Sequence, residues 1–361
     1  MTILIFFVVL FVLILVHEFG HFVTAKWTGM RVDEFGIGFP PKVFGKQFGE
    51  TEYTFNALPI GGFVRIYGED PTLVTDDPDR DRSFAAKNKL SQAIVLLAGV
   101  TMNVLFAWLL FVAIFMTGVP TVVEESVAGP DARLVVTSVL EGSPAEGVLT
   151  PGTEIIRAGT LQSEGRLLPS VFSEQVQATR GEVLALEIVS GNDTSSVTLV
   201  PEQNIVTDDP DRYAVGIALA MVDITQQSFV EAIVEATTFT ITSLRDITVG
   251  IFTLITGSFT GTADFSQIAG PVGIVGLVGD AAEFGFTALL MFTAVISLNL
   301  AVINLLPFPA LDGGRLVFVA IETVTRKPIN PIWASRLNTI GFLLLMLLMI
   351  AVTWNDIARM L

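Results

Sequence analysis

The two histidines of the chain lie four residues apart in one short motif, His17-Glu18-Phe19-Gly20-His21. On a helix, residues four apart share one face, so both imidazoles can bind the same metal ion. Glu18 follows the first histidine directly and can reach a water molecule on that ion. Two histidines at this spacing with an intervening glutamate are typical of zinc sites that activate water for hydrolysis. The motif therefore predicts a hydrolytic metal centre.

A catalytic zinc site needs a third protein ligand and an open position for water. The chain has no cysteine and no other histidine, so the third ligand must be a carboxylate or an amide. Asp312 is the strongest candidate, because it follows an apolar run that Pro307 and Pro309 interrupt. Irregular backbone at membrane depth is tolerated only where it lines a cavity. Asp280 and Glu322 are the alternatives.

The elements that must position these residues are membrane helices. Hydrophobic residues make up 51% of the 361 residues and charged residues only 16%, whereas a soluble domain carries about 25% charged residues. Four apolar runs are each near or above the roughly 20 residues that a membrane span requires. They lie at residues 3–27, 93–119, 284–311 and 337–354. We expect a retained first helix rather than a secretory signal, since a basic start and a cleavage site are both missing.

The composition excludes several other kinds of protein. The net charge of −16 argues against nucleic acid as a partner, because phosphate binding requires a basic surface. The absence of cysteine excludes disulfides, iron–sulfur clusters, thiolate zinc sites and cysteine catalysis. What remains is a polytopic protein in contact with the lipid bilayer.

The distribution of basic residues predicts the orientation of the spans. Residues 26–90 contain nine of the 20 Lys and Arg residues and residues 312–336 contain four, whereas residues 120–227 contain five against sixteen acidic residues. By the positive-inside rule the first two segments are cytoplasmic and residues 120–227 are extracytoplasmic. His17 lies about 22 Å along its helix from the outer end, at 1.5 Å per residue. We therefore expect the metal centre in the cytoplasmic half of the membrane.

The polar segment 120–227 is expected to fold as a separate β-rich domain. Strand patterns occupy residues 133–139, 183–189 and 196–200. The stretch from Val136 to Ile156, with its Ser143-Pro144-Ala145 turn, resembles a PDZ domain of the bacterial protease type. Such a domain binds a peptide, for example a substrate tail, by adding a strand to the edge of its sheet. A β-domain without a ligand is the alternative.

Residues 228–283 connect this domain to the second membrane half. Apolar residues from Phe229 to Thr240 recur at helical spacing, with Glu231 and Glu235 on another face. We expect an amphipathic helix over residues 228–256 at the outer interface; a fifth span is the alternative but conflicts with the charge distribution. The Gly/Pro segment that follows, from Gly270, is a gating element or a simple loop. The predicted parts are therefore residues 1–119, 120–227, 228–283 and 284–361.

Together these features resemble the site-2 protease family of intramembrane zinc metalloproteases. The resemblance covers nearly the whole chain and rests on the first-helix motif, the N-x-x-P-x-P-x-L-D-G-G motif from Asn304 to Gly314, and the PDZ domain between them; residues 57–64, 98–103 and 269–274 are further likenesses. It is closest to the bacterial subgroup that cleaves membrane-bound anti-sigma factors. The best-known members of that subgroup carry two PDZ domains in tandem, whereas this chain has room for one.

The resemblance implies the roles of individual residues. It implies one Zn²⁺ ion bound by His17, His21 and Asp312, with Glu18 as the catalytic acid and base and Asn304 in substrate handling. It also implies a multi-pass protein of the cytoplasmic membrane that hydrolyses peptide bonds within the transmembrane segments of single-span proteins. An anti-sigma factor and a signal-peptide remnant are the candidate substrates.

A substrate helix must unwind before it is cut, because its backbone amides are already hydrogen-bonded. Residues 53–67 surround Pro59-Ile60-Gly61-Gly62, which suggests a membrane-associated hairpin on the cytoplasmic side. We expect the edge of this hairpin, at Gly61 and Gly62, to hold the unwound substrate as an added strand; a purely structural hairpin is the alternative.

Two other classes of function are compatible with parts of the pattern. A metal-ion transporter also contains broken helices with intramembrane His and Asp residues, but transport does not explain Glu18 between the ligands. A catalytically silent receptor could act through the PDZ-like domain, but the intact glutamate beside two intact histidines argues against it.

Overall fold

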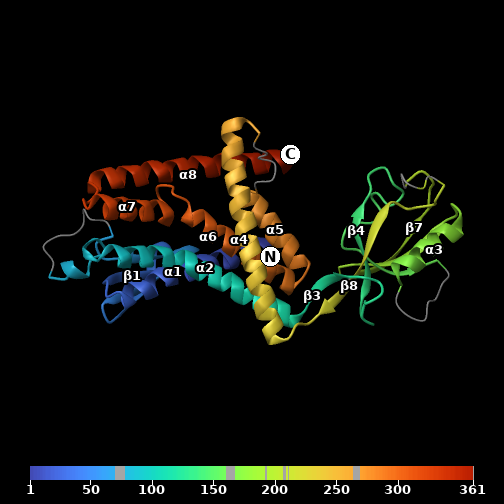
Figure 1. Cartoon of the computed structure of the whole chain (residues 1–361), viewed down its shortest axis with the longest axis horizontal. Helices are drawn as coiled ribbons and strands as arrows, with labels where there is room; N and C mark the ends of the chain where they lie inside the picture. The colour runs from blue at the N-terminus through green and yellow to red at the C-terminus, as the bar shows by residue number, and fades with distance from the viewer. Residues whose placement is uncertain are drawn as a thin grey trace. The chain divides into compact units, whose positions relative to one another are not determined.

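The computed structural model describes residues 1–69, 78–159, 167–191, 193–205, 209, 211–262 and 269–360. The chain forms two compact units (Figure 1). Unit 1 consists of Met1–Ile114 together with Val230–Leu361, and unit 2 consists of Phe115–Phe229. Unit 1 is mainly helical and carries the histidine motif, whereas unit 2 is built around a β-sheet.

Five helices among the described residues are long and apolar enough to cross a membrane. These helices are α1 (Thr2–Trp27), α2 (Lys89–Thr117), α4 (Phe229–Thr260), α6 (Phe286–Leu305) and α8 (Pro331–Met360). Four of them coincide with the expected spans. The fifth, α4, covers the amphipathic helix that was expected over residues 228–256 at the outer interface; it has 32 residues and ends at Thr260 rather than at residue 256.

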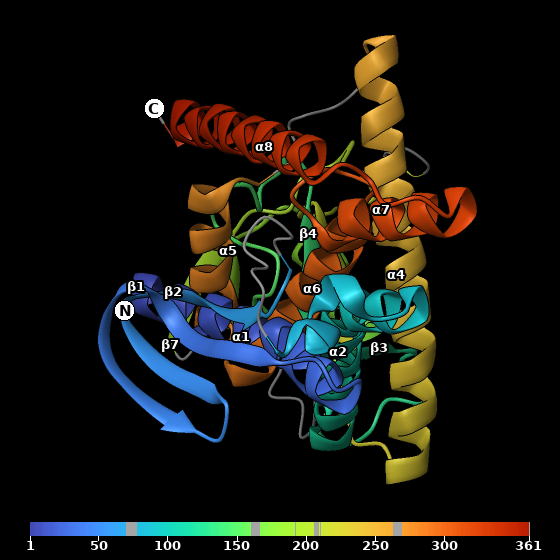
Figure 2. The same ribbon diagram turned by 90° about the vertical axis from the view of Figure 1, so that its left-hand side faces the viewer.

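Helix α4 packs against α2 along one narrow face. Ala232, Ala236 and Thr240, spaced four apart, are buried, and the ring of Phe239 lies 4.9 Å from that of Phe111 in α2. In Figures 1 and 2, α4 runs across α1, α2, α6 and α8 rather than alongside them. The faces of α4 thus differ: one carries these buried residues and Phe239, and another carries exposed apolar residues such as Val234 and Ile241.

Strands β1 (Val32–Phe48) and β2 (Thr51–Ile66) form a bent ribbon beside α1. Glu34 pairs with both Glu52 and Arg65, so the first part of β1 lies between the two ends of β2. The expected hairpin of residues 53–67 is part of this larger ribbon.

The turn between β1 and β2 is fixed by ion pairs. Glu50 lies 2.6 Å from Lys26 Nζ, at the end of α1, and 2.7 Å from a guanidinium nitrogen of Arg82. The hydrogen bond from Lys26 holds the pKa of the Glu50 carboxyl below its usual value of 4.5. The ribbon is therefore anchored at the end of the helix that carries the histidine motif.

Residues 271–283 form a helix, α5 (Pro271–Glu283), where the sequence suggested a Gly/Pro loop. Proline is favoured in the first turn of a helix, because it has no N–H to leave unpaired. The carboxylate of Asp356, in α8, accepts hydrogen bonds from the N–H groups of Gly270 at 3.1 Å and Gly273 at 2.8 Å. The local sequence around Gly270 does not reveal Asp356 as a partner, because Asp356 lies 83 residues after Gly273 in the chain.

The sheet of unit 2 has the strand order β3-β8-β4-β5-β6-β7. The alternating residues Leu134 and Val136 of β4, and Leu184, Leu186 and Ile188 of β6, point into its core. Helix α3 (Pro169–Thr179) contributes Phe172 and Val176 to the same core. The strands are β3 (Val119–Val123), β4 (Arg133–Val139), β5 (Glu154–Ala158), β6 (Leu184–Ser190), β7 (Asp193–Leu199) and β8 (Ile217–Thr225).

Candidate metal centre

The structure brings His17, His21 and Asp312 together at one point. Asp312 Oδ2 lies 3.0 Å from His17 Nε2 and 3.3 Å from His21 Nε2, and the two Nε2 atoms are 3.2 Å apart. Both histidines are buried. Within the described part of the chain, these three residues form the one group of His, Asp and Glu side chains that could hold a metal ion.

The separations fit a zinc ion. Tetrahedral zinc with bonds of about 2.0–2.1 Å places its ligand atoms roughly 3.3 Å apart, close to the three distances of 3.0–3.3 Å. At this spacing the three atoms are joined either through ring protons or through a cation that lies among them. Two imidazoles and one carboxylate are also a ligand set of known catalytic zinc sites. The residues present therefore suit zinc.

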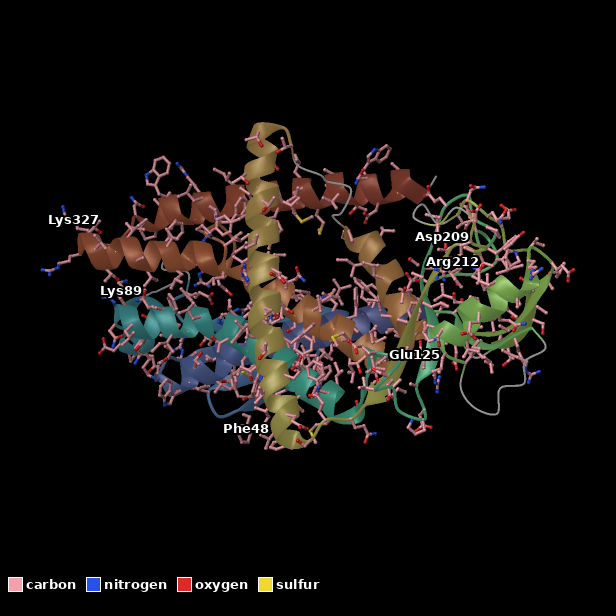
Figure 3. All side chains as sticks on the ribbon, turned by 45° about the vertical axis from the view of Figure 1, so that its right-hand side comes forward. Phe48, Lys89, Glu125, Asp209, Arg212 and Lys327 are labelled. Atoms are coloured by element: carbon pink, nitrogen blue, oxygen red, sulfur yellow. The ribbon has the colours of Figure 1, made fainter. Side chains whose placement is uncertain are left out.

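The alternative carboxylates are engaged or located elsewhere. Glu322 forms an ion pair with Lys89 at 2.5 Å, and Lys89 is labelled at the start of α2 in Figure 3. Asp280 is exposed on α5. Neither belongs to the histidine cluster.

Two glycines allow α1 and α2 to approach closely at the cluster. A Cβ atom on Gly20 of α1 would lie 2.5 Å from the carbonyl oxygen of Ala98. On Gly99 of α2, a Cβ atom would lie 2.4 Å from His21 Nε2 and 2.6 Å from His17 Cε1. Any side chain at residue 99 would thus occupy the space next to the Nε2 atoms of both imidazoles, which face Asp312.

We predict that Gly99→Ala weakens zinc binding by about tenfold or more, the scale of effect seen when groups around a metal centre are disturbed. The added methyl group must displace one imidazole. Gly250→Ala is the matched control, because a Cβ atom there meets nothing within 4 Å. Zinc affinity, measured by competition with a chelator, checks the prediction; equal affinities of the two variants would contradict it.

Asp312 reaches the cluster because α6 ends early. The helix stops at Leu305, before Pro307 and Pro309, and α7 (Asp312–Thr325) begins with Asp312 itself. The loop folds tightly onto the start of α7: a Cβ atom on Gly313 would lie 2.3 Å from the carbonyl oxygen of Leu305. The prolines and glycines of this motif thus place the carboxylate.

Glu18 lies beside the cluster and is held by the β-ribbon. Its Oε2 atom accepts a hydrogen bond from the N–H of Val64 in β2 at 3.0 Å. Glu18 and the three cluster residues line one cavity of about 200 Å³. Phe63, Val64 and Ile66 of β2 form part of its wall, and Arg315 of α7, paired with Glu69, forms another part. The cavity therefore combines a metal-binding cluster, a carboxylate and a strand.

The outer nitrogens of both imidazoles face polar groups of α2. His21 Nδ1 lies 2.7 Å from the carbonyl oxygen of Val95, and His17 Nδ1 lies 3.4 Å from the side-chain nitrogen of Asn103. Neither Val95 nor Asn103 was predicted from the sequence to have a role at the site. Residues 98–103 were noted as a family likeness, and that segment was the available signal for Asn103.

The expected substrate-handling residues do not themselves line this cavity. Asn304, Gly61 and Gly62 are not among the residues that line it. Gly61 has a φ of +145°, and a Cβ atom there would lie 3.1 Å from Ile14 of α1. On Gly62, a Cβ atom would lie 2.9 Å from the carbonyl oxygen of Gly36. Both glycines therefore permit close packing of β2.

Comparison with known proteins identifies the class of this chain. Residues 5–348 match the family described as Peptidase family M50, and the chain belongs to this family, the site-2 proteases. It is a zinc metalloprotease and a multi-pass membrane protein. The sequence-based expectation of a metalloprotease is thereby confirmed.

The relatives that match span essentially the full chain. The Clostridium perfringens protein named "Putative zinc metalloprotease CPE1693" is 36% identical, covering 96% of this chain and 95% of that protein. Zinc metalloprotease RasP of Oceanobacillus iheyensis is 30% identical over the full length of both chains. Regulator of sigma-W protease RasP of Bacillus subtilis is 27% identical over 99% of both.

Among solved structures, the PDZ domain of an SdrC-like protein from Listeria innocua matches 24% of this chain and 92% of its own length. The sequence identity is 19% and the TM-score is 0.21.

Proposed function

We propose that this metalloprotease is an intramembrane endopeptidase that binds one zinc ion and hydrolyses peptide bonds within the transmembrane segments of single-span proteins. The observation that carries the proposal is the place of the metal cluster. His17 and His21 lie in the second half of α1, a 26-residue helix that is apolar up to its histidine motif. A hydrolytic centre at this depth meets substrate segments that are themselves in the membrane.

In the proposed mechanism, the metal ligands and the catalytic base have separate roles. His17, His21 and Asp312 hold the zinc ion, which when bound activates water and polarises a carbonyl group. Glu18 accepts a proton from the attacking water and delivers it to the leaving amine nitrogen. The N–H of Val64 fixes one oxygen of Glu18, so the other oxygen remains available for proton transfer. Phe63, Val95 and Leu96 give the cavity apolar walls.

The proposed substrate track is the part of β2 next to the cavity. Val64 directs its N–H toward Glu18 rather than toward β1, so this edge of the strand faces the site. Alternate residues of a strand direct their amides to the same edge, which places the amide of Gly62 on the side of Val64. An unwound substrate can pair with this edge as an added strand. Asn304, near the end of α6, is proposed to contact the substrate backbone.

We predict that Gly62→Pro lowers cleavage of a transmembrane substrate at least tenfold without loss of bound zinc. Proline removes the N–H that a paired substrate would use. Gly62→Ala is the matched control, because it adds a Cβ atom against the carbonyl oxygen of Gly36 but keeps the N–H. Cleavage rates and metal content of both variants provide the measurement, and an unchanged rate for Gly62→Pro would refute the role of this edge.

The proposed topology has four spans, with unit 2 on the extracytoplasmic side and the metal centre toward the cytoplasm. In Figure 1, α1 and α6 run toward one end of unit 1 and α2 and α8 toward the other, as alternating spans do. The crosswise course of α4 supports its placement at the membrane interface. The basic residues of segments 26–90 and 312–336 support the orientation.

Unit 2 is proposed to be a PDZ domain that binds a peptide tail. A groove of about 630 Å³ lies between α3 and the start of β8, lined by Phe172, Val176, Ile217 and Leu219. Strand β3 pairs with β8 only from Met221 to Thr225, which leaves the preceding part of that edge open for an added strand. Arg212, labelled in Figure 3, donates to Ser173 of α3 at 2.6 Å beside this groove.

The name of the Bacillus subtilis relative, a regulator of sigma-W protease, supports membrane-bound anti-sigma factors as the substrate class. A signal-peptide remnant has the same single-span character. Incubating the purified protein in liposomes with a tagged protein of each kind, with and without a zinc chelator, tests the proposal. We expect chelator-sensitive cleavage of at least one; failure to cleave either would contradict it.

A further inference from the structure

We propose that Asn103 is a positioning residue for His17. Its side-chain oxygen accepts a hydrogen bond from the Nδ1–H group of His17 and so keeps the Nε2 lone pair free for the metal. The inference rests on the proposed zinc centre and extends it to a residue of α2 that contacts neither metal nor substrate.

The surroundings of Asn103 carry the first part of the argument. Its side chain is fully buried (0% exposed) in α2, and its terminal amide lies 3.4 Å from His17 Nδ1. The side-chain oxygen Oδ1 has no hydrogen-bond partner although it is buried. A buried amide oxygen without a partner requires an explanation, since such groups are almost always paired.

The chemistry of the imidazole selects one orientation of the amide. If the amide nitrogen donates to Nδ1, the ring proton must be on Nε2, which faces Asp312 Oδ2 at 3.0 Å and cannot then bind a metal. A half-turn of the amide exchanges its oxygen and nitrogen without changing its shape. Oδ1 then faces Nδ1–H, and the proton is on the nitrogen that points away from the metal.

His21 shows the same arrangement with a backbone acceptor. Its Nε2 faces the cluster, and its Nδ1 lies 2.7 Å from the carbonyl oxygen of Val95 in α2. Metal-binding histidines generally donate their other ring N–H to an oxygen atom, which fixes the tautomer and the ring plane. With Asn103 as the acceptor for His17, helix α2 supplies the orienting oxygen for both histidines.

Asn103 is itself held in place from a third helix. The hydroxyl of Ser297, in α6, donates to the backbone carbonyl of Asn103 at 2.8 Å. This bond involves the backbone of Asn103 and not its side-chain amide. Ser297→Ala therefore disturbs the same contact between helices without removing the acceptor for His17. Ser297→Ala is therefore a matched control.

Zinc affinity of the purified, full-length protein, measured by chelator competition, tests the inference. Asn103→Leu removes the acceptor at similar size and should weaken zinc binding by about 10- to 100-fold. Asn103→Asp retains an oxygen acceptor and should bind zinc at least as tightly as the wild type. Ser297→Ala should match the wild type. Thermal melting of the metal-free proteins verifies folding, and Asn103→Ala replaces Asn103→Leu should the leucine variant not fold.

Two results would overturn the inference. The first is wild-type zinc affinity in Asn103→Leu or Asn103→Ala, which lack the acceptor. The second is a zinc affinity of Asn103→Asp as weak as that of these variants, which would show that packing rather than the acceptor oxygen matters. A wild-type protein that itself binds no zinc would overturn the proposed metal centre, and this inference with it. Cleavage activity is not needed for any of these readouts.

Discussion

Glu18→Gln should abolish peptide hydrolysis while leaving zinc bound. Glutamine has the size of glutamate and can still accept the hydrogen bond from Val64 that holds Oε2 at 3.0 Å. It cannot accept a proton from water, and loss of general acid–base catalysis costs typically about 10²- to 10⁴-fold in rate. The ligand atoms of His17, His21 and Asp312 are untouched by the change, so the metal content should equal that of the wild type.

The measurement pairs single-turnover cleavage with zinc analysis of the same preparations. Phe19, the next residue on α1, has an exposed side chain, and Phe19→Leu is a control for changes near the motif. Wild-type rates in Glu18→Gln would show that another group moves the proton. Loss of both zinc and activity would mean that Glu18 is a metal ligand rather than the base.

Asp312→Ala should remove zinc and activity together. The carboxylate is the one oxygen ligand in the cluster, 3.0 Å and 3.3 Å from the two imidazole nitrogens. With two histidines left, the site no longer has the three protein ligands that a catalytic zinc requires. We expect zinc affinity to fall by at least 100-fold, on the scale of losing a whole ligand rather than a neighbouring group.

Asp280→Ala is the matched control, because the sequence alone left Asp280 open as a ligand and the structure places it on α5, outside the cluster. The measurement is the metal content of both variants and their zinc affinity, determined by chelator competition. Tight zinc binding by Asp312→Ala, or its loss in Asp280→Ala, would contradict the proposed ligand set.

The grouping of His17, His21 and Asp312 was predictable because its signals are local. The spacing of His17 and His21 fixes their common face on a helix, whatever the helix packs against. Asp312 was marked by the prolines and glycines around it, and the structure shows why: α6 ends before Pro307, and the start of α7 packs directly on the loop. Local chemistry was enough in both cases.

The residues that contact the imidazoles of the cluster were not predicted from the sequence. Val95 and Asn103 face the imidazoles because Gly20 and Gly99 let α1 and α2 come close. The roles of these residues follow from the relative rotation of two helices, which the residue pattern of either helix alone does not determine. The same applies to Asp356, which reaches the start of α5 from a distant part of the chain.

The irregular parts of unit 1 also differed from expectation for physical reasons. The Gly/Pro segment after Gly270 became helix α5 because Pro271 suits a first helical turn and Asp356 accepts the free amides. The ribbon of β1 and β2 pairs Glu34 with two residues at once, a pattern that alternation of apolar residues cannot reveal.

The central claim is that hydrolysis takes place inside a membrane-spanning segment. The most direct test is mass spectrometry of the products formed from a tagged single-span substrate by the purified protein in liposomes, with Glu18→Gln in parallel. The account predicts new termini within the hydrophobic span of the substrate, produced by the wild type only. Termini confined to the soluble flanks, or the same products from Glu18→Gln, would contradict it.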